Sequence, residues 1–263
     1  MRAAISTITV NIPPEFQIGP LTIAWHGLTI ALGILLGGLL AARLARNRGL
    51  DPEPLQTIGL IIVASAIVGG RAFYLVEHGQ LLQPDHWLGT HGFTFYGGFI
   101  TAAASIAIYL RRTGRSIVYL DLVAIALPLG VAVGRIGDII NGEHYGPQTD
   151  FFLGVRNAHP DALTPDPALA FHNGGLYEVL LSLIIFAIVW PLRDRLRTPS
   201  AISWLVIGLY GAGRFVEFFA RDDSEDVALG INGAQWTSVA LVIVALAGAA
   251  MTVGRSRWQA RAA

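Results

Sequence analysis

The sequence predicts an all-helical, polytopic membrane protein with seven transmembrane helices, its N-terminus outside and its C-terminus in the cytoplasm. Three observations lead to this fold class. Hydrophobic residues make up 53% of the 263 residues and charged residues only 14%, whereas soluble domains carry about 25% charged residues. Apolar stretches of membrane-spanning length recur along the whole chain. Arginines gather in every second connection between these stretches, which fixes the direction of the chain.

Seven apolar stretches have a length close to the roughly 20 residues that a helix needs to cross the hydrocarbon core of a bilayer. The third is short and rich in glycine at its start. The predicted spans are residues 21–42, 55–77, 93–110, 117–137, 174–192, 201–220 and 235–254. We expect residues 1–263 to form a single transmembrane domain with an extracytoplasmic loop at about 147–173. This loop is rich in Pro and Asp, and loops of such length are often functional or mobile.

The distribution of arginine predicts the orientation. All 18 basic residues are arginine. The connections after spans one, three, five and seven hold twelve of them: Arg43, Arg46, Arg48, Arg111, Arg112, Arg115, Arg193, Arg195, Arg197, Arg255, Arg257 and Arg261. The opposite side has only Arg2, Arg156 and Arg221. The positive-inside rule therefore places the N-terminus outside.

The composition excludes several kinds of chemistry. The chain has no cysteine, which excludes a thiol nucleophile, a thiolate metal site and structural disulfides of its own. Its net charge is zero, so nucleic acid is not an expected partner. A group of possible ligands after span two matches no standard metal spacing, and we predict no metal. These residues are His78, Asp85, His86 and His91.

Three arginines, Arg71, Arg135 and Arg214, fall inside predicted spans two, four and six. Each lies in the last third of its helix, and all three helices run outward, so the arginines share one depth in the outer leaflet. Ionisable groups inside a membrane are costly and point to function. One alternative is that each arginine snorkels to the interface, and another is that each forms a structural salt bridge. Three at one depth favour a shared polar cavity.

Other polar residues collect at the same depth, at the outer ends of the spans. They are His26, Tyr96, Asp138, Asn141, Glu143, His172, Glu178, Glu217 and Arg221. Tyr210, Arg214, Glu217 and Arg221 share one helical face. Arginine clusters bind phosphate through charge-assisted, often bidentate hydrogen bonds. At this depth the phosphate most naturally belongs to a phospholipid head group, so the sequence predicts a protein that binds an anionic lipid from outside.

Five motifs, taken together and in order, give the chain a family resemblance. They are FYGG (95–98), GRIGDIINGEHYG (134–146), HNGGLYE (172–178), YGAGRFVEFFARDD (210–223) and GAQWTS (233–238). With these motifs the chain resembles the phosphatidylglycerol–prolipoprotein diacylglyceryl transferases over nearly its whole length. Each motif alone is weak, whereas five motifs across seven predicted spans are specific.

The resemblance implies a transferase of the cytoplasmic membrane that takes part in lipoprotein biosynthesis. The diacylglyceryl group of phosphatidylglycerol would move to the cysteine thiol in the lipobox of a prolipoprotein signal peptide. A thioether would form and glycerol phosphate would leave, without a cofactor. Because the substrate supplies the thiol, the reaction agrees with an enzyme that lacks cysteine. The partners are then phosphatidylglycerol, prolipoprotein signal peptides and membrane lipid.

The resemblance and the polar pattern together give two sets of candidate residues. We expect the lipid phosphate to be bound by Arg135, Arg214, Arg71, Tyr210, Asn141 and Gly146. The candidate catalytic residues are His26, Tyr96, Asp138, Glu143, His172 and Glu217. Histidine suits the deprotonation of a thiol near neutral pH, so His26 and His172 are the candidate bases. Glu143 is expected to orient other groups, and Gly142 and Gly146 to shape the exit of span four.

The chain departs from the family pattern at several candidate residues. Asp138 stands where the family usually has Asn, and Glu217 follows Arg214 by three residues rather than four. His26 stands where many members have Tyr, and Tyr96 where many have His. This exchange is consistent with a His–Tyr pair that has swapped roles across one cavity.

Two rival interpretations belong to other classes. A transporter or lipid flippase would use the same arginines, but it should show polar residues at both leaflets or at the midplane. The cytoplasmic halves of the predicted spans are almost wholly apolar, which argues against this. The second rival is a paralogue that kept lipid binding and lost catalysis, which Asp138 and His26 make conceivable.

Overall fold

The computed structural model describes residues 7–88, 92–222 and 226–262. Side chains in the last helix are described up to Gly254. Arg2 and His91 therefore lie outside the described residues, as do the side chains of Arg255, Arg257 and Arg261.

Six helical segments of the described chain are long and apolar enough to cross a membrane. These segments are α1 (Trp25–Asn47), α2 (Pro54–Glu77), α4 and α5 together (Val118–Gly134 and Ile136–Asn141), α6 (Gly174–Leu192), α7 with the short helix η2 (Ala201–Glu217 and Phe218–Ala220), and α8 (Gly233–Ala262) up to Gly254. They confirm a helical, polytopic membrane protein. Helix α3 (Phe95–Arg112) lies where the third span is predicted but is not among the six. The total of seven transmembrane helices and the orientation of the termini stay predictions.

The predicted start of the first span, at residue 21, is wrong. Strand β3 (Leu21–Ala24) pairs antiparallel with β2 (Glu15–Ile18), and α1 begins only at Trp25. The turn between them contains Gly19 at φ +60°, a conformation that costs glycine little. Because Leu21–Ala24 is apolar and continues into an apolar helix, hydropathy alone does not separate the strand from the span.

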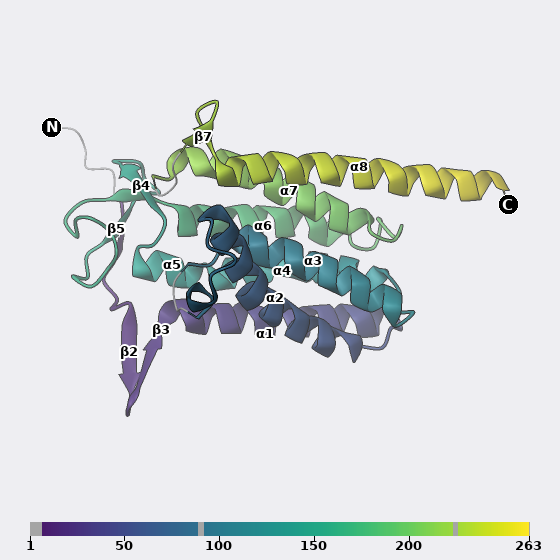
Figure 1. Ribbon diagram of the computed structural model, residues 1–263, viewed down its shortest axis with the longest axis horizontal. Coiled ribbons are helices and arrows are strands. Elements are labelled where there is room, and N and C mark those ends of the chain that lie inside the picture. Colours follow the sequence, from purple (N-terminus) through teal and green to yellow (C-terminus); the bar gives the residue numbers. More distant parts are fainter. Residues whose placement is uncertain (1–6, 89–91, 223–225, 263) are drawn as a thin grey trace. The chain divides into compact units, whose positions relative to one another are not determined.

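A small sheet is built from segments far apart in the sequence (Figure 1). Its order is β1 (Ile8–Val10), β5 (Val155–Asn157), β6 (Phe171–Asn173) and β4 (Tyr145–Gln148). Strands β1 and β5 are parallel, while the β5–β6 and β6–β4 pairs are antiparallel. The predicted loop at 147–173 thus contains two short strands. A two-stranded ribbon, β7 (Asp226–Ala228) and β8 (Ile231–Asn232), precedes α8.

The chain divides into two compact units. The second unit, residues 38–123, holds α2, the short helix η1 (Pro84–His86) and α3. Helices α2 and α3 pack closely at glycines: a Cβ atom on Gly69 would lie 2.9 Å from the carbonyl oxygen of Gly97. Small residues at such contacts let two membrane helices approach each other.

The first unit, residues 1–37 and 124–263, holds the sheet and α5 to α8. Helix α6 packs on α7, and α7 lies along α8 (Figure 1). The start of α6 is fixed by its cap, because the Asn173 side chain accepts a hydrogen bond of 2.8 Å from the Leu176 amide. This helix has the predicted bounds, 174–192.

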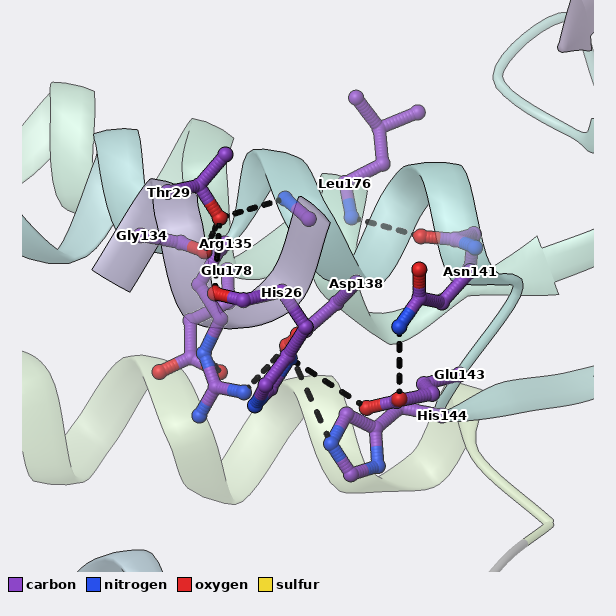
Figure 2. Close-up of polar contacts among 12 residues, drawn as sticks. His26, Thr29, Gly134, Arg135, Asp138, Asn141, Glu143, His144, Leu176 and Glu178 are labelled. Atoms are coloured by element: carbon purple, nitrogen blue, oxygen red, sulfur yellow. Dashed lines mark hydrogen bonds and ion pairs between the residues drawn. The ribbon is translucent and has the colours of Figure 1, made fainter. Parts of the chain in front are cut away.

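The fourth apolar segment breaks at Arg135, between α4 and α5. Thr29 of α1 satisfies backbone groups on both sides of the break: its Oγ1 donates to the Gly134 carbonyl oxygen at 2.8 Å and accepts from the Gly137 amide at 3.1 Å (Figure 2). A Cβ atom on Gly137 would lie 2.5 Å from the Cα atom of His26. Glycine therefore lets the first turn of α1 lie directly against α5.

The exit of α5 is irregular, as predicted. Gly142 ends the helix in the left-handed conformation, and strand β4 follows. A Cβ atom on Gly146 would lie only 1.9 Å from the Ala220 carbonyl oxygen, so no larger residue fits there without a shift. Asn157 of β5 also donates to the Ile139 carbonyl oxygen at 2.8 Å. The small sheet and the end of α7 thus hold this exit in place.

Candidate active site

Asp138 is the centre of the polar cluster that the structure forms in the first unit. Its side chain has no solvent exposure. One carboxylate oxygen, Oδ1, lies 2.6 Å from Nδ1 of His26. The other, Oδ2, accepts a hydrogen bond from the Arg135 guanidinium and lies 3.9 Å from Nε2 of His144. Figure 2 shows the two histidines converging on this carboxylate from different segments. The negative charge that Asp138 adds is therefore paired with Arg135.

Glu178 of α6 joins the two arginines of the cluster. Nε of Arg135 lies 2.9 Å from Oε2 of Glu178, and Nη1 of Arg214 lies 2.7 Å from the same oxygen. The Tyr210 hydroxyl donates to the other oxygen, Oε1. Both oxygens of this buried carboxylate are thus satisfied, as a charge inside the protein requires.

The chain of ion pairs continues along α7 and returns to Asp138. Arg214 Nη1 lies 2.7 Å from Glu217 Oε2, and Arg221 Nη1 lies 3.5 Å from Glu217 Oε1. Nη2 of Arg221 lies 2.7 Å from Nδ1 of His144, whose Nε2 faces Asp138. We call this closed set the ionic ring. Its members are Asp138, Arg135, Glu178, Arg214, Glu217, Arg221 and His144.

The ionic ring balances three guanidinium groups against three carboxylates. Buried charges that lack partners are strongly destabilising, whereas this pairing leaves no net charge. The ring is therefore a supported polar framework rather than a bare anion-binding cluster.

Solvent exposure separates the cluster into two sides. The side chains of Glu178, Arg214 and Glu217 are 1%, 4% and 3% exposed. Those of Arg135, Glu143, His144 and His26 are 13%, 26%, 32% and 37% exposed. We call these four residues the accessible side. These four side chains are in contact with solvent, whereas the buried members are enclosed by the protein.

Glu143 stands beside His26 on the accessible side. Its Oε2 lies 3.6 Å from Nδ1 of His26, and its Oε1 accepts a 3.0 Å hydrogen bond from the Asn141 amide group. Asn141 thus orients Glu143 in this structure.

His26, Asp138 and Glu143 also have the spacing of a possible cation site, because their ligand atoms lie within 4.8 Å of one another. The Arg135 guanidinium already contacts Asp138 and would repel a cation placed there. The predicted lack of a metal stays a prediction.

Other predicted site residues have different surroundings. His172 of β6 contacts the Tyr177 hydroxyl through Nδ1, and its ring lies near that of Phe151. Tyr96 lies buried at the start of α3, in the second unit. Arg71 is also in that unit, where its guanidinium donates to the carbonyl oxygens of His86 and Gly92, at 2.9 and 3.0 Å from Nε and Nη1. These bonds fasten the loop that follows α2.

His144 and Thr29 were not predicted from the sequence, and Arg221 was not among the predicted site residues. For each of the three, a feature of the sequence could have pointed to the site. His144 follows Glu143 directly in the signature motif, Thr29 lies one helical turn after His26, and Arg221 shares the helical face of Arg214.

The fold and the site together define a polytopic membrane protein with a largely buried ionic ring that is accessible at Arg135 and His144. Comparison with protein-family models matches residues 13–251 to prolipoprotein diacylglyceryl transferase. The chain belongs to this family. The family predicted from the sequence motifs is thereby confirmed.

Curated relatives match most of the chain. The phosphatidylglycerol–prolipoprotein diacylglyceryl transferase of Azoarcus sp. (strain BH72) is 32% identical over 254 residues, which cover 89% of this chain and 92% of that protein. The enzyme of the same name from Geobacillus kaustophilus (strain HTA426) is 35% identical over 245 residues, covering 88% of each chain. The similarity thus extends over nearly nine tenths of the chain.

Proposed function

We propose that this protein transfers the diacylglyceryl group of phosphatidylglycerol to prolipoproteins. The observation that carries the proposal is the family match over residues 13–251, because it includes every member of the ionic ring and the accessible side. The curated relatives are named for this reaction.

The acceptor is the lipobox cysteine of the prolipoprotein signal peptide. Its thiolate attacks the glyceryl carbon that bears the phosphate ester, the C–O bond breaks, and glycerol phosphate leaves. The product is a thioether. The enzyme has then to take the thiol proton, hold the phosphate and accommodate the charge that moves onto the leaving group.

His26 is the candidate base because of its contact with Asp138. A carboxylate accepts hydrogen bonds, so Nδ1 of His26 carries the proton in the 2.6 Å contact. Nε2 then holds the lone pair that can take the thiol proton. In serine hydrolases, likewise, an aspartate orients the histidine and the histidine takes the proton of the nucleophile. The 37% exposure of the His26 side chain leaves it accessible to a substrate.

Arg135 is the candidate for direct contact with the lipid phosphate, because its guanidinium reaches the accessible side. Arg214 is more deeply buried and is bonded to Glu178 and Glu217. Its support for phosphate binding is therefore indirect: it holds Glu178, and Glu178 in turn holds Arg135. Tyr210 fixes the same carboxylate.

The other candidate residues have supporting roles in this proposal. Glu143, oriented by Asn141, faces His26, and Glu217 links Arg214 to Arg221. Gly146 keeps the exit of α5 close to the end of α7. His172 is the second candidate base, and the roles expected for Tyr96 and Arg71, which belong to the second unit, stay predictions.

The distribution of arginine supports a cell-membrane location with the site toward the outer leaflet. Helix α3 would be the seventh span, because its last turn carries Arg111 and Arg112 in the same pattern as the other cytoplasmic ends. The N-terminus and the 147–173 segment would then lie outside.

Incubating the purified protein with phosphatidylglycerol and a lipobox peptide tests the proposed function. We expect the peptide to gain the mass of one diacylglyceryl group, and a peptide with Ser in place of its Cys to gain none. No mass gain, combined with movement of the lipid between leaflets of a vesicle, would support the flippase alternative. Lipid binding without either activity would support the catalytically altered paralogue.

A further inference from the structure

Two histidines approach the Asp138 carboxylate. The Nδ1 atom of one faces a negatively charged group, and the Nδ1 atom of the other faces a positively charged group. Nδ1 of His26 lies 2.6 Å from a carboxylate oxygen of Asp138. Nδ1 of His144 lies 2.7 Å from Nη2 of Arg221. The hydrogen on a neutral imidazole is placed by the partner of each nitrogen, so the two contacts require different tautomers.

The guanidinium group has five N–H donors and no acceptor. In the contact with Arg221, Nδ1 of His144 therefore accepts the hydrogen bond and carries the lone pair. His144 is then neutral, and its proton resides on Nε2. His26 has the reverse arrangement, with its proton on Nδ1 and its lone pair on Nε2.

We propose that His144 is a substrate-binding residue whose Nε2–H group donates a hydrogen bond to the lipid phosphate, and that it is not an acid–base catalyst. This inference rests on the proposed function, whose donor lipid supplies the phosphate. It divides the two histidines by role: His26 takes the proton of the thiol, and His144 holds the anion.

The position of Nε2 suits a phosphate that also contacts Arg135. Nε2 of His144 lies 3.9 Å from Oδ2 of Asp138, the oxygen that the Arg135 guanidinium contacts. Because both donors approach this oxygen from different segments, they lie close enough together for different oxygens of one phosphate on the accessible side to accept from them. The His144 side chain is 32% exposed, and it belongs to the accessible side.

The backbone at His144 is consistent with a functional residue. Its φ angle is +58°, in the left-handed region that non-glycine residues seldom occupy. The surrounding structure holds this conformation, because the His144 carbonyl oxygen accepts a 2.9 Å hydrogen bond from the Gly174 amide at the start of α6. Unusual backbone conformations persist where neighbouring contacts fix them, often at sites of function.

Two substitutions separate the donor of His144 from its contact with Arg221. In His144→Asn the amide oxygen can still accept from Arg221 near the position of Nδ1, and asparagine tolerates the left-handed conformation. This variant lacks a donor at the position of Nε2. In His144→Gln the longer amide can supply that donor but not the acceptor at Nδ1. His159→Asn, in the 147–173 segment, is the matched control.

The affinity for phosphatidylglycerol is measured by native mass spectrometry in detergent, and transfer to the lipobox peptide is measured alongside it. A hydrogen bond to a charged group implies a loss of affinity on the order of 10-fold or more in His144→Asn. We expect KM for the lipid to rise equally, while kcat and the pH–rate profile keep their wild-type form. His144→Gln should recover part of the affinity, and His159→Asn should match wild type.

Wild-type affinity in His144→Asn would overturn the inference, as would an altered pH–rate profile with unchanged affinity, because the second result makes His144 an acid or base. Wild-type affinity in His144→Asn combined with a loss of affinity in His144→Gln would assign His144 to support of Arg221 instead. If the wild-type protein binds the lipid but does not transfer it, the proposed function fails while the affinity comparison still decides the role of His144.

Discussion

Nδ1 of His26 lies 2.6 Å from Oδ1 of Asp138, although 112 positions separate the two residues in the sequence. The contact depends on the break in the fourth apolar segment, where Gly137 admits the backbone of His26 and Thr29 satisfies the freed backbone groups. The result is an imidazole held by a fully buried carboxylate at the edge of a membrane helix.

Replacing His26 tests its role as the base. General-base catalysis is typically worth roughly 10² to 10⁴-fold in rate, so His26→Ala should lose about that much transfer activity. His26→Tyr should not restore the rate alone, whereas combination with Tyr96→His should recover part of it if the two positions exchange roles. Transfer rates of the single and double variants at fixed lipid concentration measure this. A wild-type rate for His26→Ala across neutral pH would make His172 the next candidate.

Arg135 and Arg214 should respond differently to substitution. Arg135→Ala should abolish transfer, and Arg135→Lys should restore little because lysine lacks the forked donor geometry. Arg214→Ala should also reduce the free energy of unfolding by about 3–5 kcal/mol, since it leaves Glu178 and Glu217 buried without their shared partner. Melting temperature in detergent and transfer rate, recorded for all three variants, separate the two effects. Near-normal turnover and melting in Arg214→Ala would contradict the ionic ring.

Arg71 offers a test between a loop contact and a phosphate ligand. Its bonds to the carbonyl oxygens of His86 and Gly92 predict that Arg71→Ala speeds amide hydrogen exchange in residues 79–88. Arg115→Ala removes an exposed ion pair with Asp51 in the same unit and is the control. An unchanged exchange rate in Arg71→Ala, together with a raised KM for phosphatidylglycerol, would favour the phosphate role instead.

The orientation can be tested with cysteines, because the chain contains none of its own. Cysteines introduced at Arg46, Arg112 and Arg195 should be shielded from an impermeant thiol reagent in intact cells. A cysteine at Asp161 should be labelled. The opposite labelling pattern would reverse the topology and place the site in the inner leaflet.

Hydropathy predicted most of the fold because each membrane helix appears in the sequence as a long apolar run. The span at 174–192 has the predicted bounds, since Asn173 caps it. The strands were not predicted: each is two to four residues long, and β1 pairs with β5 across a large sequence separation. Nor does hydropathy reveal the break at Arg135, which depends on a threonine from another helix.

Much of the site could be predicted, because the motifs and the common depth of the polar residues select most members of the ionic ring. His144 was not predicted because its position in the site depends on a left-handed backbone conformation and on a contact with Arg221. The residues next to it in the sequence reveal neither feature. Arg214 was interpreted as a direct phosphate ligand. In the structure its guanidinium pairs with carboxylates from α6 and α7, and its direct contact with phosphate stays a prediction.

The central claim is that this site transfers a diacylglyceryl group from phosphatidylglycerol to a thiol. It is tested most directly with phosphatidylglycerol labelled with deuterium in both acyl chains, incubated with the purified protein and a lipobox peptide. We expect the peptide to gain the mass of one fully labelled diacylglyceryl group on cysteine and one glycerol phosphate to appear for each modified peptide. Arg135→Ala should yield neither product. An unmodified peptide with the folded wild-type protein, or equal yields from wild type and Arg135→Ala, would contradict it.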